Sequence, residues 1–280
     1  MLQPTGTVPG EDRTSYFEPV PGSVADRVAA RYEDSPPAVP VVGTYVAGWA
    51  ALSAFFTVIG LLLVEVVLAG RPGEWDASAS RWLAERRTDW VNGLTGAATF
   101  IANTFPVIAV VAACCLVLLL LRRWREAVFL AGALLLEVTV FLTANTLADR
   151  SRPDVPRLDS TPSTGSFPSG HAAASLALWV GLAIIVSTNV RHRVVAVLAW
   201  IVAAVLAVGV AFARTYRGMH HVTDVVAGMA LGIGALAVSL LAVRVVSGTV
   251  DRHRARTGVT GHAVESDTAV AAPSPVEVTR

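Results

Sequence analysis

The sequence predicts an all-α polytopic membrane protein with six transmembrane helices. Apolar residues make up 54% of the 280 positions and charged residues only 15%, whereas a soluble domain carries about 25% charged residues. The charges lie in the two tails and in short clusters between long apolar runs. Runs of about 20 apolar residues cross a bilayer as helices, because a helix bonds its backbone polar groups within itself.

Six apolar segments have this length, and we place them near residues 44–69, 98–121, 126–148, 169–188, 194–213 and 224–246. The second is the weakest, because Pro106 interrupts it and its first part is only mildly apolar. The stretch between the first two segments places Trp75, Trp82 and Trp90 among charged residues. That pattern is typical of a helix that lies in the membrane interface.

The chain divides into a membrane domain, residues 44–246, and two tails. Residues 1–43 and 247–280 are rich in Pro, Ser, Thr, Glu and Arg and lack apolar periodicity, so both tails are predicted to be disordered. In the last span Gly228, Gly232 and Gly234 allow close helix packing. We expect packing within the chain, with a homodimer as the alternative.

The arginines indicate the orientation. All 22 basic residues are arginines, and six spans place both tails on one side of the membrane. The raw arginine counts of the two sides differ little, but five arginines opposite the tails fall in polar clusters: Arg150, Arg152, Arg157, Arg214 and Arg217. With these set aside, the positive-inside rule places both tails in the cytoplasm and the clusters outside the cell membrane. No basic stretch is interleaved with aromatic residues, so no nucleic-acid partner is expected.

Three polar clusters are brought to one membrane face by this topology. They are NTLADRSRPDVPRLD (145–159) after the third span, FPSGH (167–171) at the start of the fourth, and ARTYRGMHHVTD (213–224) between the fifth and sixth. The first two clusters lie in the same loop, and two further crossings bring the third cluster back to that side, so all three emerge on the same side. We therefore expect an active site at this face.

The residue types in these clusters favour the binding of an anionic ligand. Arg152 and Arg214 offer planar forks for oxyanions. Ser169 is a plausible helix N-cap, Gly170 lets the backbone approach a ligand, and the free N–H groups of a helix start bind anions.

Two histidines could act as catalytic groups at this anion site. His220 and Asp224 stand four residues apart, so the carboxylate can orient the imidazole as a base or nucleophile. His171 is a second imidazole, available as a general acid. Together the residues suit phosphoryl transfer. A metal held by His171, His220, His221 and Asp224 is the alternative, but no cysteine is near and the helical His-Glu pattern of zinc enzymes is missing. No metal or other cofactor is expected.

The order R-P, P-S-G-H, then R-x5-H-x3-D resembles the signature of the type 2 phosphatidic acid phosphatase family. That family groups membrane lipid phosphate phosphatases with soluble acid phosphatases and vanadium haloperoxidases. The resemblance implies that His220 attacks phosphorus to form a phosphohistidine, that Asp224 orients it, and that His171 protonates the leaving oxygen and later activates water. It also implies a phosphate held by Arg152, Arg214, Ser169 and the Gly170 backbone.

The sequence departs from the family where a lysine precedes the R-P arginine by seven residues. That position is Asn145, which can donate a hydrogen bond but brings no charge. Arg150 is the candidate to supply the missing charge. In the third motif Ala213 replaces a serine, which removes one hydrogen bond at most.

The expected function is that of a membrane phosphatase acting on a lipid phosphate or diphosphate. Undecaprenyl diphosphate, phosphatidic acid and phosphatidylglycerol phosphate are candidates, and an outward-facing site suits lipid carriers. The alternative is a non-catalytic lipid-phosphate-binding or transport protein. Glu65 and Glu137, two carboxylates within apolar spans, favour that alternative. Glu137 lies about 12 Å along the helix from Asn145, which is too deep for the phosphate pocket.

Overall fold

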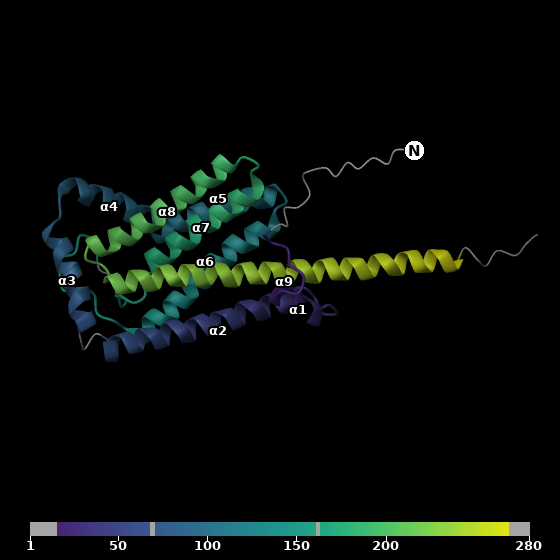
Figure 1. Cartoon of the computed structure of the whole chain (residues 1–280), viewed down its shortest axis with the longest axis horizontal. Helices are drawn as coiled ribbons and strands as arrows, with labels where there is room; N and C mark the ends of the chain where they lie inside the picture. Colours follow the sequence, from purple (N-terminus) through teal and green to yellow (C-terminus); the bar gives the residue numbers. More distant parts are fainter. Residues whose placement is uncertain (1–15, 68–70, 161–162, 269–280) are drawn as a thin grey trace, which may run out of the picture.

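The computed structural model describes residues 16–67, 71–160 and 163–268, which contain helices and no strand. The helices are α1 (Val24–Arg31), α2 (Ala38–Leu62) with the π-turn η1 (Leu63–Val67), α3 (Arg71–Glu85), α4 (Asp89–Ile101), α5 (Thr104–Leu120), α6 (Trp124–Ala148), α7 (Gly170–Asn189), α8 (Arg193–Tyr216) and α9 (Val222–Thr268). The long helices run side by side, and α3 lies across one end of the bundle (Figure 1).

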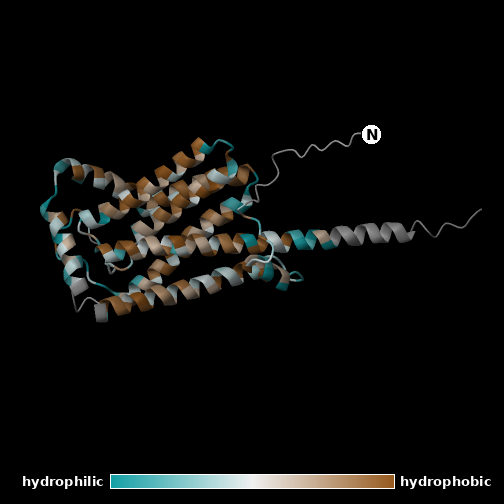
Figure 2. Cartoon of the chain, viewed as in Figure 1, coloured by the Kyte–Doolittle hydropathy of each residue, from teal (hydrophilic) through white to brown (hydrophobic). Residues whose placement is uncertain are grey.

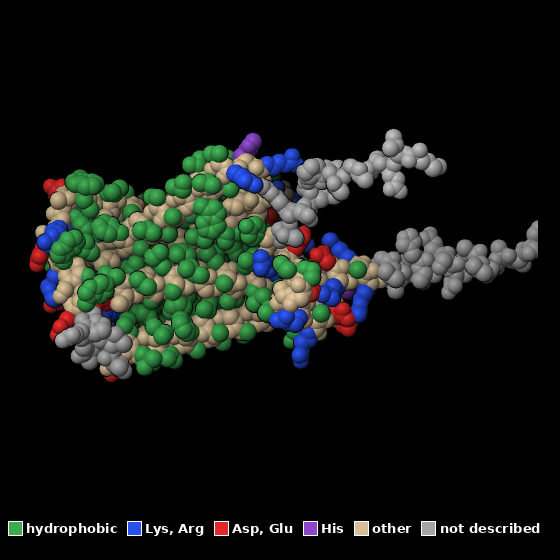
Figure 3. Space-filling model, viewed as in Figure 1, with side chains coloured by type: hydrophobic (Ala, Val, Ile, Leu, Met, Phe, Trp, Pro, Cys, Tyr) green, Lys and Arg blue, Asp and Glu red, His purple; other side chains and the backbone are tan. Residues whose placement is uncertain are grey.

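Within the described residues, five helices are long and apolar enough to cross a membrane: α2, α6, α7, α8 and α9. The pair α4 and α5 passes the same test jointly, with a bend of 51° between the two helices. Hydrophobic residues cover the middle of the bundle and charged residues gather at its two ends (Figures 2 and 3). The chain is therefore a multi-pass membrane protein with up to six spans.

The second predicted span is broken into α4 and α5, but the break does not lie at Pro106, where the sequence places the interruption. The break lies at Ala102 and Asn103, and Pro106 sits in the first turn of α5. Proline is tolerated there because its missing N–H would have no helical partner. Asn103 has extended backbone angles at the N-cap of α5, so the chain turns before the proline.

Glycines set the separation of α7 and α9, as the last span predicts. A Cβ at Gly228 would lie 2.3 Å from the Ser169 carbonyl oxygen, and one at Gly232 would lie 2.7 Å from that of Ala173. Only glycine permits this approach. The contacts confirm the predicted packing within the chain.

The tails are more ordered than expected where the structure describes them. Phe17 is 2% exposed and packs edge-on against Phe129, α1 forms within the tail, and α2 begins at Ala38. At the other end α9 continues beyond residue 247, and Arg252 pairs with Asp26 of α1 at 2.5 Å. This corrects the disorder predicted for residues 16–43 and for the start of 247–280. The buried residues of α1 are the small alanines Ala25 and Ala29. Because alanine is only weakly hydrophobic, hydropathy gives little indication that this part of the tail packs against the bundle.

The tryptophan-rich stretch forms two helices, α3 and α4, instead of one. Trp75, Trp82 and Trp90 are all more than half exposed, as an interfacial helix requires. Asp76, which follows Trp75, is fully buried. The tryptophans of α3 therefore point outward while the neighbouring Asp76 carries a carboxylate into the protein.

Candidate active site

The three polar clusters meet at one end of the bundle, as the topology predicts. The loop between α6 and α7 folds over the turn between α8 and α9, with hydrogen bonds from Ser169 N to Asp224 O (2.9 Å) and from Leu158 N to Arg217 O (3.1 Å). Gly218 has a left-handed φ of 73° in that turn, which glycine adopts without strain. The α7 start and the α9 start are thereby held against each other.

His220 lies in the α8–α9 turn and is 4% exposed. Its Nδ1 contacts the Ser166 carbonyl oxygen at 2.7 Å. A carbonyl only accepts, so Nδ1 carries the proton and Nε2 keeps a free lone pair. Burial, followed by the charges of Arg214 and Arg152, holds the pKa of His220 well below its usual range. The imidazole is therefore neutral, in the form that a nucleophile requires.

His171, in the first turn of α7, contacts the Asn103 side-chain oxygen through Nε2 at 3.0 Å. An amide oxygen accepts, so this contact leaves Nδ1 to face other groups. Asn103 was not anticipated from the sequence. Its position three residues before Pro106, where the apolar run is interrupted, was the available signal. The bend between α4 and α5 brings a polar residue to the histidine.

Arg152 and Arg214 line one cavity together with both histidines. Arg152 donates from Nη1 to Met219 O at 2.8 Å and from Nη2 to Gly165 O at 3.0 Å. Arg214 donates from Nη1 to Asp159 at 3.0 Å. Within the described part of the chain, the buried Nε atoms of both arginines have no hydrogen-bond partner. Buried unpaired donors are costly unless a ligand accepts from them.

Ser169 and Gly170 stand at the N-terminus of α7. Ser169 has the extended backbone of an N-cap, but its buried Oγ has no partner among the described residues. A Cβ at Gly170 would lie 3.1 Å from the Phe141 ring, so this glycine accommodates Phe141 as well as lining the cavity. Ser169 is fully buried and is not among the residues that line the cavity, so of these two it is Gly170, at the helix start, that adds to the anion-binding character of this end.

Asp224 does not orient His220 directly. Its Oδ2 lies 3.9 Å from His220 Nδ1 and accepts instead from the His221 N–H at 2.9 Å. The other oxygen, Oδ1, is bonded to Arg150. The Ser166 carbonyl therefore takes the orienting position that the sequence assigns to Asp224, and Asp224 fixes the turn that carries His220.

Arg150 binds carboxylates and is not among the residues that line the cavity. It is 3% exposed and donates from Nη2 to Asp76 of α3 at 2.8 Å, from Nη1 to Asp224, and to Thr223 Oγ1 at 2.7 Å. Burial raises the pKa of Asp76, but the hydrogen bonds from Thr223 and Arg150 outweigh it and hold that pKa below its ordinary value. This corrects the prediction that Arg150 replaces the family lysine.

The Asn145 side chain also binds other groups of the protein. It is 2% exposed, and its Nδ2 donates to Gly165 O at 3.1 Å and to Phe167 O at 2.9 Å. Both amide hydrogens are used, so none remains for a phosphate. Asn145 holds the segment before Ser169 against the end of α6.

Asp159, which the sequence did not single out, pairs with two arginines of the third cluster. It accepts from Arg214 at 3.0 Å and from Arg217 at 2.6 Å. Burial raises the pKa of Asp159, but the bond from Arg217 and the charges of both arginines hold it below its ordinary value. Asp159 thus sets the direction of the Arg214 fork.

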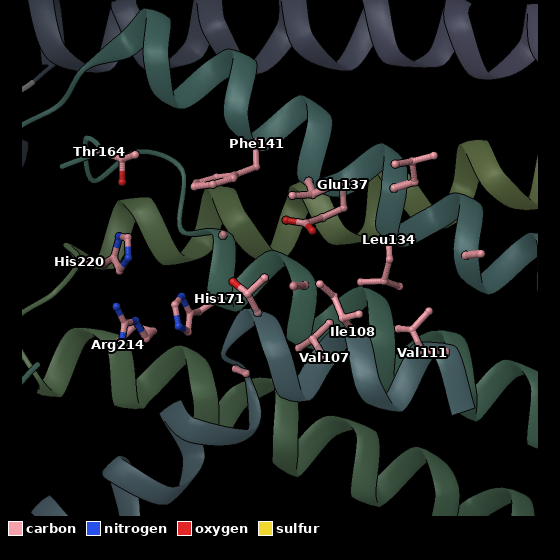
Figure 4. Close-up of a pocket in the computed structure, with 18 of the residues that line it drawn as sticks. Val107, Ile108, Val111, Leu134, Glu137, Phe141, Thr164, His171, Arg214 and His220 are labelled. Carbon is pink, nitrogen blue, oxygen red and sulfur yellow. The ribbon is translucent and has the colours of Figure 1, made fainter. Parts of the chain in front are cut away.

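The cavity extends far beyond the histidines. It has a volume of about 700 Å³ and runs between α5 and α6. Figure 4 places His220, Arg214 and His171 at one end, and Leu134 and Val111 at the other. The remote part is lined mostly by apolar side chains: Val107, Ile108, Val111, Leu134, Leu135 and Val138. A ligand that fills it combines an anionic head with an apolar body.

Among the described residues, no group of three or more His, Cys, Asp or Glu side chains is placed to hold a metal ion. Of the four residues considered for that role, His171, His220 and Asp224 have side chains bonded to other partners, whereas the buried Nδ1 of His221 has no hydrogen-bond partner among the described residues. His221, the fourth, has its pKa lowered to about 4 by burial and by Arg150.

Comparison with known proteins agrees with the motif. Residues 127–246 match the PAP2 superfamily. Phosphatidylglycerophosphatase B of Bacillus subtilis (strain 168) is 28% identical over 185 residues, which are 62% of this chain and 85% of that protein. The crystal structure of a transmembrane PAP2-type phosphatidylglycerolphosphate phosphatase from Bacillus subtilis matches with a TM-score of 0.57 at 22% identity, over 68% of this chain and 93% of that one. At that identity the structural match supports the fold alone.

Proposed function

Because residues 127–246 match the PAP2 superfamily, we propose that the chain is a membrane phosphatase that hydrolyses a lipid phosphate or diphosphate through a phosphohistidine. One observation carries the proposal. The neutral His220 lies with Arg152 and Arg214 at one end of a cavity whose remaining length is apolar.

The chemistry proceeds in two displacements. The His220 Nε2 lone pair attacks phosphorus, and the bond from phosphorus to the leaving oxygen breaks. His171 in its protonated form gives its Nδ1 proton to that oxygen, while Nε2–H stays bonded to Asn103. Water then attacks phosphorus and gives a proton to His171, the bond from phosphorus to His220 Nε2 breaks, and inorganic phosphate leaves.

The arginines stabilise charge in both displacements. Arg152 and Arg214 approach from different elements, the α6–α7 loop and the end of α8. Their backbone and Asp159 bonds fix the forks before substrate arrives. Such preorganised donors act where negative charge develops on the phosphoryl oxygens. This sequence of steps uses no metal ion.

The substrate is a lipid whose phosphate sits at the membrane border. The name of the Bacillus relative makes phosphatidylglycerol phosphate a candidate, beside phosphatidic acid and undecaprenyl diphosphate. The apolar part of the cavity begins beside His171 and is formed by membrane-spanning helices. An acyl or prenyl chain can therefore remain in apolar surroundings while its phosphate reaches His220.

We place the site on the outer face, with the α1 end of the bundle in the cytoplasm. Arginines of the α5–α6 and α7–α8 turns and of α9 gather at the α1 end, which carries much blue in Figure 3. Two single-cysteine variants test this after Cys114 and Cys115 are replaced. An impermeant thiol reagent on intact cells should label Ser160→Cys and spare Ala255→Cys, and the reverse pattern would overturn the orientation.

The activity is tested with purified protein and a panel of lipid phosphates, by measuring released phosphate. We expect turnover that survives EDTA and is inhibited by vanadate, a mimic of pentacoordinate phosphorus. His220→Ala should abolish turnover and the acid-labile phosphoprotein formed on rapid quenching. Loss of activity on chelation would refute the metal-free route, and tight binding of every lipid without turnover would favour the non-catalytic alternative.

A further inference from the structure

Glu137 places a carboxyl group in the apolar part of the cavity, where the chemistry above does not use it. It lies in the middle of α6, is 2% exposed and lines the cavity. Its carboxyl lies between the histidine end and the Leu134 end (Figure 4). No hydrogen bond or ion pair joins it to another residue of the described chain. Glu65, the other carboxylate within an apolar span, is exposed at the end of α2.

The depth of Glu137 follows from its helix. Phe141 lies one turn nearer the site, with its ring against Gly170, the residue before His171. Glu137 is therefore roughly one helical turn, about 5.4 Å, deeper than the level of His171. The cavity residues around this depth are Ile108, Val111, Leu134 and Val138, all apolar.

A carboxyl in such surroundings without a cation is stable as the neutral acid. A neutral acid has one O–H donor. With no acceptor in the described protein, this donor is unsatisfied until a ligand supplies one. A purely hydrocarbon chain cannot do so.

We propose that Glu137 determines specificity by donating a hydrogen bond to an ester carbonyl of an acylglycerol phosphate. The inference rests on the proposed function, because the phosphate must be anchored at His220. In such lipids the ester carbonyls follow the phosphorus after a few bonds, and Glu137 lies beyond both histidines along the cavity, toward its apolar end (Figure 4). A polyprenyl chain carries no acceptor at this depth, and the second phosphate of a diphosphate stays beside the first.

A pair of lipids that differ only in this acceptor tests the inference. Dioleoyl phosphatidic acid and its dialkyl ether analogue, in the same mixed micelles, share the phosphate and the chain length. A single neutral hydrogen bond predicts a preference for the ester of about fivefold in kcat/KM for the wild-type protein. Glu137→Leu should reduce the ratio to about one, while Glu137→Gln should keep it because the amide still donates.

Thr139→Val is the matched control. Thr139 lies on the same helix, does not line the cavity, and bonds its hydroxyl to Leu135 O at 2.9 Å. The ester-to-ether ratio of this variant should equal that of the wild type.

The outcomes separate the two proposals. If the wild-type protein hydrolyses neither lipid, the proposed function fails and the inference falls with it. If it hydrolyses both with equal kcat/KM, the inference alone is overturned, whether or not the leucine variant folds. A leucine variant that keeps the ester preference, or a glutamine variant that loses it, would likewise overturn the role of Glu137.

Discussion

Asp76→Asn perturbs a buried cluster in which one arginine serves two carboxylates. Arg150 donates to Asp76 of α3 and to Asp224 of α9, and all three side chains are at most 3% exposed. The charges sum to −1, from one cation and two anions. The substitution leaves Arg150 and Asp224 as a balanced pair, and the asparagine oxygen can still accept from Arg150 and Thr223.

The expected cost is therefore moderate. Asp76→Asn replaces charge-assisted hydrogen bonds by weaker neutral ones, but a neutral amide costs less to bury than a carboxylate. The net effect should be to lower the free energy of unfolding by about 2 kcal/mol. Arg150→Leu should cost more, about 3–5 kcal/mol, because it leaves two buried carboxylates without a cation. For a chain of this size, each kcal/mol shifts Tm by roughly 2–4 °C.

Thermal unfolding in detergent measures this ordering. Glu85→Gln is the control, because Glu85 is 71% exposed and its pair with Arg86 is at the surface, so its effect should stay within about 0.5 kcal/mol. If Arg150→Leu left Tm unchanged and raised the Michaelis constant as Arg152→Leu does, Arg150 would be a phosphate ligand after all. Equal losses for Asp76→Asn and Arg150→Leu would contradict the charge argument.

The cluster also predicts a pH dependence. The pKa of Asp76 is held below its ordinary value, by the bonds from Thr223 and Arg150 that outweigh burial. A lowered folded-state pKa means stability that is present above the unfolded value, about 3.9 for aspartate, and lost as pH falls through the folded value. The Tm of Asp76→Asn should therefore fall less than that of the wild type below about pH 4.

Three further substitutions test individual contacts. Asn103→Leu removes the acceptor of the α7 histidine, so turnover of lipids with poor leaving groups should fall roughly tenfold, part of the 10²–10⁴ that acid catalysis supplies; an equal loss with an activated aryl phosphate would count against a positioning role. Asn145→Asp removes two donors to loop carbonyls, so Tm and activity should both drop, by roughly 1–3 kcal/mol in stability, and an improved Michaelis constant would contradict this. Gly228→Ala places a Cβ 2.3 Å from a backbone oxygen of α7 and should cost about 1–3 kcal/mol, whereas Gly209→Ala, which meets nothing within 4 Å, should not lower Tm.

The spans and the side on which the polar clusters meet could be predicted from the sequence. Hydropathy is a property of continuous segments, so α6, α7 and α8 were placed to within three residues at each end. The first span was placed six residues too late at its start, and α9 extends well beyond the predicted end at residue 246. The convergence of the clusters required only counting crossings. The glycine spacing that lets α7 pack on α9 also lies within one segment of the sequence, so it could be predicted in the same way. The fold of the tails was missed because alanines and ion pairs across distant helices carry no such signal.

The partners of the polar side chains were decided by the tertiary structure. The sequence grouped Asn145 with the phosphate ligands because it occupies the position of the family lysine, and Arg150 because it lies near Arg152. In the structure Arg150 turns to Asp76, 74 positions away, and Asn145 to loop carbonyls about 20 positions away. His171 meets Asn103, 68 positions away, and His220 meets a carbonyl oxygen, which is an acceptor on every residue and so invisible in sequence. A long polar side chain can reach in several directions, and burial makes it pair with whichever group the packed helices bring within hydrogen-bond distance.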